Sequence, residues 1–279
     1  MKVTIIGLGL IGGSIARDLK SQINVSVTGV DINPRHLELA MELGLVHDVL
    51  DFDIGIRKAD VIILAIPVDK IEMILPEVLD MIDDSQVVID VGSTKEFICS
   101  AVAAHPKRRR YVAAHPLAGT EYSGPTAAIQ RLFVDKKNII CEKDKIDADA
   151  LEIAQKIFIS MGMKTYFLDP AEHDKHLAYV SHLSHVSSFM LGLTVLDIEK
   201  DEDQIFNLAS TGFASTVRLA KSNPQTWAAI FNKNNNHLST ALESYIDYLK
   251  QFKEAIDSKD KATMLKLMAD ANDIKRILN

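Results

Sequence analysis

The chain has 279 residues, of which 47% are hydrophobic and 25% charged, and its formal net charge is −7. These are the proportions of an ordinary globular protein, and the acidic balance argues against nucleic acid as a partner. A chain of this length usually divides into two domains, which we place at residues 1–169 and 170–279. No stretch approaches the ~20 apolar residues that cross a membrane, and no targeting segment is recognisable.

Two smaller features of the composition concern compartment and surface. Cys99 and Cys141 are far apart in the chain and fit neither a disulfide framework nor a metal-binding knuckle. Free thiols are typical of a reducing compartment, so we expect a cytoplasmic protein. The basic cluster "KRRR" at residues 107–110 is interpreted as a solvated loop before a strand, with a binding patch as the alternative.

Short β-branched runs alternate with amphipathic segments over the first 168 residues. The predicted strands cover residues 2–6, 25–30, 60–66, 86–91, 110–114, 137–141 and 164–168, and the predicted helices include 35–44, 68–82 and 147–162. Almost entirely apolar strands that alternate with helices are typical of a parallel sheet covered on both faces. The fold class is therefore α/β, with a Rossmann-type, doubly wound, mostly parallel sheet followed by an all-α helical domain.

The first predicted strand leads into a glycine-rich turn. In "VTIIGLGLIGGSIARDL", three glycines have the G-x-G-x-x-G spacing between a strand and a helix. The first permits the tight turn, the second lets the backbone approach a pyrophosphate, and the third allows the helix to pack closely on the strand. The helix N-terminus then stabilises the phosphate charge. We therefore predict a dinucleotide site formed by Gly7, Gly9, Leu10, Ile11 and Gly12.

The second predicted strand ends at Asp31, nineteen positions after Gly12. An acidic residue at this place binds the ribose hydroxyls of NAD and repels the 2′-phosphate of NADP. Arg35 follows closely and would tolerate a phosphate. The agreement of turn, strand, helix and acid favours NAD as the cofactor.

The next two strands end in "AIPVD" and "DVGSTK". Ligands of open α/β sheets bind beyond the carboxyl ends of the strands, so Pro67 and Ser93 are expected beside the cofactor. Ser93 has a second interpretation, because "STKEF" has the form of a capping box in which Glu96 is the acidic partner. The residues alone do not separate these two interpretations.

His115 lies in "VAAHPLAGTEYSGP", after an apolar strand and before a proline and a glycine. We therefore place it on a constrained turn at the cofactor-facing edge of the sheet rather than in the core. Histidine titrates near neutrality, so it can accept a proton while an alcohol gives hydride to NAD. We predict that His115 is this proton acceptor.

After residue 170 the pattern is helical, and "YVSHLSHV" places two histidines three positions apart. Helical spacing puts His182 and His185 on one face with Ala178, Val186 and Phe189. Neither "HDKH" nor "HLSH" has the H-E-x-x-H frame of a zinc site, so no metal is expected. Inward-facing histidines opposite a nicotinamide crevice are predicted to line a substrate pocket between the domains.

Two apolar stripes at helical spacing follow near the end of the chain. One runs through Leu238, Leu242, Tyr245, Leu249, Phe252 and Ile256, and the other through Leu265, Met268, Ala271, Ile274 and Ile277 or Leu278. Stripes of this kind are normally buried, and a small helical domain offers little surface to cover two of them. We predict a homodimer, with packing inside one chain as the alternative.

Five motifs in this order resemble the prephenate dehydrogenase family, which includes cyclohexadienyl and arogenate dehydrogenases. They are "GLGLIGGS", "DVGSTK", "HPLAGTE", "HDKHLAYVSHLSHV" and "ASTGFASTVRLAKSNPQTW". The resemblance covers nearly the whole chain, and the last three motifs are far more specific than the glycine triplet. It implies a dinucleotide domain, a helical dimerisation domain, and NAD-dependent oxidative decarboxylation of prephenate to 4-hydroxyphenylpyruvate in tyrosine biosynthesis.

The resemblance also implies roles for individual residues. The family's catalytic histidine falls on His115, and the serine that hydrogen-bonds this histidine or the substrate falls on Ser93. The family's substrate-pocket positions fall on His182, His185, Arg218 and Trp227. Arg218 would bind a substrate carboxylate through its planar fork.

The chain departs from the family at two places. It has "HLSH" where the family has HLPH, and Ala214 and Ser215 where many members have a basic residue and an aspartate. Such an aspartate could hold the arginine in place, so the sequence leaves open how Arg218 is positioned. It also leaves open the choice between prephenate and arogenate.

Two other classes of function compete with this interpretation. A β-hydroxyacid-type dehydrogenase would share both domains, but those enzymes commonly depend on a lysine of the helical domain. A non-catalytic NAD-sensing protein would not need His115, Ser93 and Arg218 to coincide with a catalytic pattern. The paired histidines and the arginine favour the prephenate dehydrogenase interpretation.

Overall fold

The computed structural model describes residues 1–22, 24–199 and 211–276. Ala209 and Ser210 of the last motif, and Ile277 and Leu278 of the second stripe, lie outside the described residues. The described chain packs as two compact units, Met1–Asn234 and Asn235–Asn279, and each unit is described by itself below.

A sheet of eight strands forms the centre of the first unit. The strands are β1 (Lys2–Ile6), β2 (Ser26–Val30), β3 (Asp48–Val49), β4 (Val61–Leu64), β5 (Val87–Asp90), β6 (Tyr111–Pro116), β7 (Lys137–Cys141) and β8 (Lys164–Leu168). Their order is β3-β2-β1-β4-β5-β6-β7-β8, and every pairing is parallel except that between β6 and β7. The predicted doubly wound, mostly parallel sheet and its seven strands are confirmed, and the short β3 was not predicted.

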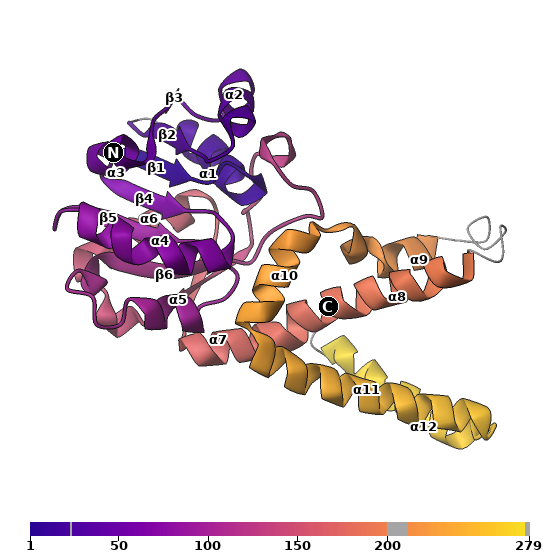
Figure 1. The fold of residues 1–279 in the computed structure, drawn as a ribbon. Coiled ribbons are helices and arrows are strands. Elements are labelled where there is room, and N and C mark those ends of the chain that lie inside the picture. The colour runs from indigo at the N-terminus through magenta and orange to yellow at the C-terminus, as the bar shows by residue number, and fades with distance from the viewer. Residues whose placement is uncertain (23, 200–210, 277–279) are drawn as a thin grey trace. The chain divides into compact units, whose positions relative to one another are not determined.

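Helices cover both faces of this sheet (Figure 1). Val3 and Ile5 of β1 face a core shared with α1 and α6, whereas Ile6 faces a core shared with α3, α4 and α5. The helices of this half are α1 (Leu10–Lys20), α2 (Pro34–Glu42), α3 (Phe52–Lys58), α4 (Val68–Met81), α5 (Glu96–Ala101) and α6 (Ala148–Ser160). Burial on both faces explains why the central strands are apolar at successive positions.

The basic cluster before β6 is part of the packed structure. Arg108 and Arg110 are buried in a short 3₁₀ helix, η1 (Arg108–Arg110). Arg108 pairs with Glu142 at 2.6 Å, and Arg110 pairs with Asp149 at 2.8 Å. The expectation of a solvated loop is therefore wrong for two of the three arginines, because each neutralises an acid of the β7–α6 region.

Every element that the structure describes after β8 is helical, as predicted. These elements are α7 (Pro170–Leu177), the π-helical turn η4 (Ala178–His182), α8 (Leu183–Glu199), α9 (Thr211–Thr216), η6 (Arg218–Lys221), α10 (Pro224–Lys233), α11 (Asn235–Asp257), α12 (Lys261–Ala271) and η7 (Asn272–Arg276). Within the described ranges, no helix combines the length and the apolar character that crossing a membrane requires.

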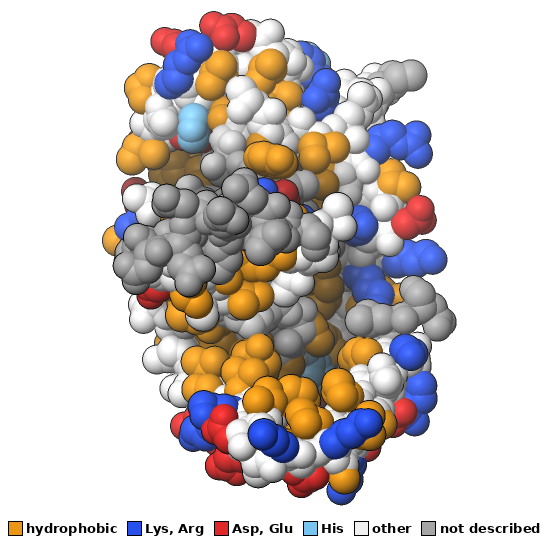
Figure 2. All heavy atoms as spheres, turned by 90° about the vertical axis from the view of Figure 1, so that its right-hand side faces the viewer, with side chains coloured by type: hydrophobic (Ala, Val, Ile, Leu, Met, Phe, Trp, Pro, Cys, Tyr) orange, Lys and Arg blue, Asp and Glu red, His pale blue; other side chains and the backbone are white. Residues whose placement is uncertain are grey.

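The second unit exposes much of its predicted apolar stripes. On α11 only Leu238, Ala241 and Ala255 are buried. Leu249 remains 51% exposed and Leu265 remains 53% exposed. Figure 2 shows hydrophobic side chains gathered in its lower part, at the height where Figure 1 shows α11 and α12. Packing within one chain therefore leaves these stripes partly uncovered.

Candidate functional site

The turn between β1 and α1 has the geometry that its glycines were predicted to allow. Gly7 has a φ of +96°, and a Cβ built there would lie 2.5 Å from the carbonyl oxygen of Ala65. A Cβ on Gly12 would lie 1.9 Å from the carbonyl oxygen of Gly7, whereas a Cβ on Gly9 would meet nothing within 4 Å. Side chains are therefore excluded at two of these positions, while the third borders open space.

The start of α1 can receive an anion at this turn. Gly9 precedes the helix without a side-chain cap, and the first helical turn contains no acidic residue. Leu10 and Ile11 are the first two residues of α1, and both are half-buried. Uncapped N–H groups at the positive end of a helix suit a phosphate. The residues present therefore fit a dinucleotide pyrophosphate.

Asp31 is held beside this turn at the end of β2. Its carboxylate accepts hydrogen bonds from the backbone N–H of Leu8 at 2.8 Å and of Asn33 at 2.9 Å. The Nδ1 of His36, a residue not singled out in the sequence, lies 3.2 Å from the same carboxylate. Arg35 is exposed and pairs with Glu38 at 2.9 Å. The cation that would tolerate a 2′-phosphate is thus already paired with an acid.

Pro67 lies directly before α4, where the chain leaves β4. Its neighbours Ala65 and Ile66 are the residues that a Cβ on Gly7 would strike. The two segments that were predicted to border a cofactor therefore adjoin each other at the carboxyl edge of the sheet.

His115 lies in the last part of β6 rather than on the turn after it. It pairs with Ile139 of β7 and is only 8% exposed, so the expectation of a turn position is wrong. Its Nδ1 lies 2.8 Å from Nε2 of His173, whose Nδ1 lies 2.7 Å from Oδ1 of Asp174. His173 and Asp174 of α7 belong to the motif "HDKHLAYVSHLSHV", whose pattern assigns no role to either residue.

Asp174 also connects α7 to the start of α5. Its two carboxylate oxygens accept the backbone N–H groups of Lys95 at 2.8 Å and Glu96 at 2.9 Å. The residue before α5 is Lys95, which has no side-chain cap of its own. The capping-box interpretation of Ser93 is therefore not realised, because a carboxylate from another helix occupies the capping position.

A buried charge network lies beside this chain of contacts. Lys95 forms an ion pair with Asp90, and both side chains are fully buried. The hydroxyl of Tyr111 donates to the same carboxylate at 2.6 Å. Burying a charge is costly unless it is paired and hydrogen-bonded, and both conditions are met here. The network connects Asp90 at the end of β5 to Tyr111 at the start of β6.

One cavity of about 350 Å³ brings the predicted catalytic and substrate-pocket residues together. Its lining includes Ser93, His115, His182, His185, Arg218 and Trp227. Within the described residues, no hydrogen bond joins Ser93 to His115, although both border the cavity. The arrangement places neutral histidines, a cation and aromatic surface around a space that suits a small molecule.

The paired histidines reach this cavity by way of a π-helical turn, which their spacing did not predict. His182 is buried, and its Nδ1 lies 3.0 Å from Nδ2 of Asn234. His185 is half-buried and stacks on Trp227 with 3.3 Å between ring centroids. Turns of this kind often occur at functional sites, because they redirect side chains without ending the helix.

Burial keeps these histidines neutral. It is the main cause that lowers the pKa of His115 well below the ordinary histidine value, and its neighbours His173 and Lys95 act in the same direction. Burial likewise lowers the pKa of His182 to about 4 and lowers that of His185. A neutral imidazole is the form that can accept a proton.

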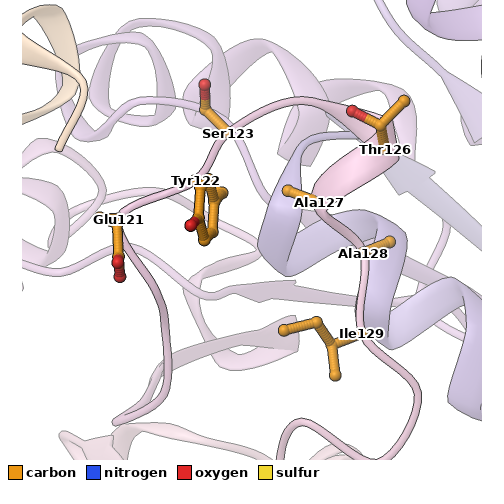
Figure 3. Close-up of a pocket in the computed structure, with 7 residues that line it drawn as sticks. All are labelled: Glu121, Tyr122, Ser123, Thr126, Ala127, Ala128 and Ile129. Atoms are coloured by element: carbon orange, nitrogen blue, oxygen red, sulfur yellow. The ribbon is translucent and has the colours of Figure 1, made fainter. Parts of the chain in front are cut away.

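Arg218 receives its partner from the loop after β6. Its Nη1 donates to Oε2 of Glu121 at 2.9 Å, and its side chain is 51% exposed. Glu121 itself borders a different cavity of about 530 Å³, which is lined by residues of the loop between β6 and β7. Figure 3 shows Glu121, Tyr122 and Ile129 around this hollow. Among the described residues, no group of three or more histidine, cysteine or acidic side chains is placed to hold a metal ion.

Comparisons with known proteins agree over most of the chain. A profile described as "Prephenate dehydrogenase, nucleotide-binding domain" matches residues 15–167, and one described as "Prephenate dehydrogenase, dimerization domain" matches residues 169–270. The cyclohexadienyl dehydrogenase of Zymomonas mobilis is 30% identical over 92% of this chain and 89% of its own length. The prephenate dehydrogenase of Bacillus subtilis is 29% identical over 99% of this chain and 76% of its own length.

A solved structure extends this likeness to the fold. Prephenate dehydrogenase from A. aeolicus, in complex with hydroxyphenyl propionate and NAD+, superposes with a TM-score of 0.88 at 28% sequence identity. The superposition covers 99% of this chain and 97% of the other.

Proposed function

The chain belongs to the prephenate dehydrogenase family, and on this basis we propose that it catalyses the NAD-dependent oxidative decarboxylation of prephenate to 4-hydroxyphenylpyruvate. The observation that carries the proposal is the cavity in which a neutral, buried His115 and the cation Arg218 face one small volume. The reaction needs one proton acceptor and at least one anchor for a substrate with two carboxylates.

NAD is the proposed cofactor, and the residues at the β1–α1 turn have distinct tasks. The backbone of Gly9, Leu10 and Ile11 binds the pyrophosphate at the start of α1. Asp31 accepts hydrogen bonds from the ribose hydroxyls with the lone pairs that its backbone contacts leave free. Pro67 and Ser93 border the nicotinamide, which supplies the hydride acceptor when bound.

The substrate is held and deprotonated from opposite sides of the cavity. Arg218 binds a carboxylate through its fork, while His182, His185 and Trp227 form the wall against the ring. His115 takes the proton of the 4-hydroxyl as hydride leaves the ring carbon that bears it. The oxidised ring then loses carbon dioxide and becomes aromatic, which makes the reaction effectively irreversible.

One observation favours arogenate as a second candidate substrate. Glu121 places a carboxylate beside Arg218, which lines the cavity, and an ammonium group bound near Arg218 would find a partner there. Arogenate carries an amine where prephenate carries a ketone.

We further propose that two chains form a homodimer and that the domain boundary follows Asp169. Cys99 and Cys141 are buried free thiols, which supports the proposal that the protein is cytoplasmic.

The test is an absorbance assay for NADH with NAD or NADP against prephenate and arogenate. We expect NADH with NAD and prephenate. His115→Asn should bind NADH as before but lower kcat by about 10²–10⁴, the range of general acid–base catalysis. The matched control is His176→Asn, because His176 is an exposed histidine on α7 that lies outside the cavity lining.

The acid limb of the pH profile provides a further check on the base. His115 must be unprotonated to act, so kcat/KM should fall as the pH drops through its pKa. Because burial lowers that pKa, the fall should lie below the range of an ordinary histidine. No NADH with either substrate would reject the proposed function, and full activity of His115→Asn would reject the assigned base.

A further inference from the structure

His115 is the first member of a buried hydrogen-bonded chain that ends on a carboxylate. The links are His115 Nδ1 to His173 Nε2 at 2.8 Å and His173 Nδ1 to Asp174 Oδ1 at 2.7 Å. His173 is fully buried and Asp174 is 1% exposed. This hydrogen-bonded chain occupies the Nδ1 side of His115, and neither His173 nor Asp174 lines the cavity, so Nε2 is the nitrogen of His115 that can face it.

The direction of each hydrogen bond follows from Asp174. Both of its oxygens already accept backbone N–H groups, from Lys95 and Glu96, so this carboxylate acts only as an acceptor. His173 must then donate from Nδ1, which leaves its Nε2 bare in the neutral ring. A bare Nε2 accepts, so His115 must donate from Nδ1. The Nε2 of His115 is consequently the unprotonated nitrogen.

The charged groups around the three hydrogen-bonded residues leave Asp174 available to stabilise a positive charge on a histidine. Five charged or titratable groups surround His173, and they are Lys95 and Asp90 at the β5–α5 connection, His115 on β6, Asp174 on α7 and His182. Lys95 and Asp90 pair with each other, and the buried His182, whose pKa is lowered mainly by burial, lies within hydrogen-bond distance of Asn234. Among the described residues, the ion pair of Asp174 involves His173 alone. One buried negative charge thus remains to offset a positive charge on the two histidines.

We propose that His173, held by Asp174, is a positioning residue that fixes His115 in the tautomer with an unprotonated Nε2 toward the cavity and shares the proton that His115 accepts. The proposal rests on the proposed function for the identity of that proton. The tautomer itself follows from the contacts alone.

The proton can be followed through the reaction. It leaves the 4-hydroxyl oxygen for Nε2 of His115 while hydride leaves C4 for NAD+, and C4 becomes a carbonyl carbon. The Nδ1 proton of His115 can then shift to Nε2 of His173, where Asp174 balances the charge. The C1 carboxylate departs as carbon dioxide and leaves its bonding pair in the ring. The C4 oxygen takes back a proton from His115 and becomes the phenol, so the histidine pair stores the proton only between these steps.

The tautomer can be measured without any variant. Nitrogen-15-labelled histidine in the wild-type protein should show a protonated Nδ1 and a bare Nε2 for both His115 and His173 in proton–nitrogen correlation spectra at neutral pH. The His115→Asn and His173→Gln spectra assign the two signals. A protonated Nε2 on neutral His115 would overturn the proposal whether or not the protein turns over prephenate.

Kinetics of two His173 variants separate positioning from mere packing. His173→Leu removes the acceptor and should lower kcat by about 10²–10³, within the range of an acid–base contribution. His173→Gln keeps a carbonyl acceptor for His115 Nδ1 and should lose only about tenfold. In both variants the KM for prephenate and the affinity for NADH should stay within about threefold of wild type.

The controls make each outcome decisive. His176→Gln on the same helix should behave as wild type, since its side chain is exposed. Equal losses in the two His173 variants, or losses shared between kcat and KM, would overturn the proposal. If His173→Leu does not fold, the retained activity of His173→Gln and the wild-type tautomer decide. An inactive wild type would reject the proposed function alone, because the spectra test the tautomer independently.

Discussion

The guanidinium of Arg218 lies 2.9 Å from the carboxylate of Glu121, so the cation that lines the cavity is already paired with an anion. A substrate carboxylate would compete with Glu121 for the same planar fork. Half of the Arg218 side chain is exposed, which leaves it room to change partner. This contact answers how the arginine is positioned, because the acid comes from the loop after β6 rather than from positions 214 and 215.

The role of Arg218 can be tested by the size of its effect on binding. A hydrogen bond to a charged group contributes ~1.5–3 kcal/mol, so Arg218→Ala should raise the KM for prephenate by about 10- to 100-fold. The effect on kcat should be small, since the same contact exists before and during the reaction. Arg218→Lys keeps the charge without the fork and should fall between these values.

Steady-state kinetics with saturating NAD measure both parameters. An unaltered KM in Arg218→Ala would place the carboxylate anchor elsewhere in the cavity. The control is Lys221→Ala, which removes a cation from the same 3₁₀ helix at a residue outside the cavity lining.

The position of a single residue was predictable from the sequence where a local pattern of neighbouring residues indicated it. His115 stood at the end of an apolar run beside prolines and glycines, which was enough to place it at the edge of the sheet. Its partner was not predictable, because His173 follows 58 positions later and only the tertiary fold brings them together. The same reason hid the contact of Asp174 with the start of α5, which spans 79 positions.

At the scale of elements, the turn between β1 and α1 contains Gly9 and Gly12, which are glycines for different reasons. Gly12→Ala would place a Cβ 1.9 Å from a backbone oxygen, so the strand and helix would have to move apart. We expect this variant to lose ~1–3 kcal/mol of unfolding free energy, as other overpacked sites do. Gly9→Ala meets no protein atom, so its stability should be unchanged. Its methyl group instead enters the space proposed for the pyrophosphate, and its affinity for NADH should fall.

Urea denaturation without cofactor and titration with NADH measure the two effects separately. Gly9→Ala and Gly12→Ala serve as controls for each other, since both add one methyl group to the same turn. A Gly9→Ala variant that binds NADH as tightly as wild type would move the pyrophosphate away from this turn.

Elements were predictable to the extent that periodicity determines them. The seven strands were apolar runs of β-branched residues, and the structure places a strand in each. The reversal of β7 was not predictable, since an apolar run has no direction of its own. The π-helical turn at Ala178–His182 was also missed, because a single extra residue barely disturbs the helical pattern.

At the scale of the whole molecule, the exposed apolar stripes carry the argument for a second chain. Four apolar side chains of α11 and α12 are about half exposed, namely Leu249, Ile256, Leu265 and Met268. Large exposed apolar surfaces of this kind mark interaction sites. The profile that matches residues 169–270 is that of a dimerization domain. The boundary at residue 169 stays a prediction, because spatial packing divides the described chain after Asn234.

The proposed homodimer predicts a specific sensitivity to charge on α11. Leu249→Glu would bury an unpaired carboxylate in the interface, which costs several kcal/mol, so the dissociation constant should rise by about 10²-fold or more. Sedimentation at micromolar concentration should show a wild-type dimer and a variant shifted toward monomer. Gln251→Glu adds the same charge two positions away, on the other side of the helix, and should remain dimeric because an exposed charge there stays solvated. A monomeric wild type would reject the homodimer, and a dimeric Leu249→Glu would move the interface away from this stripe.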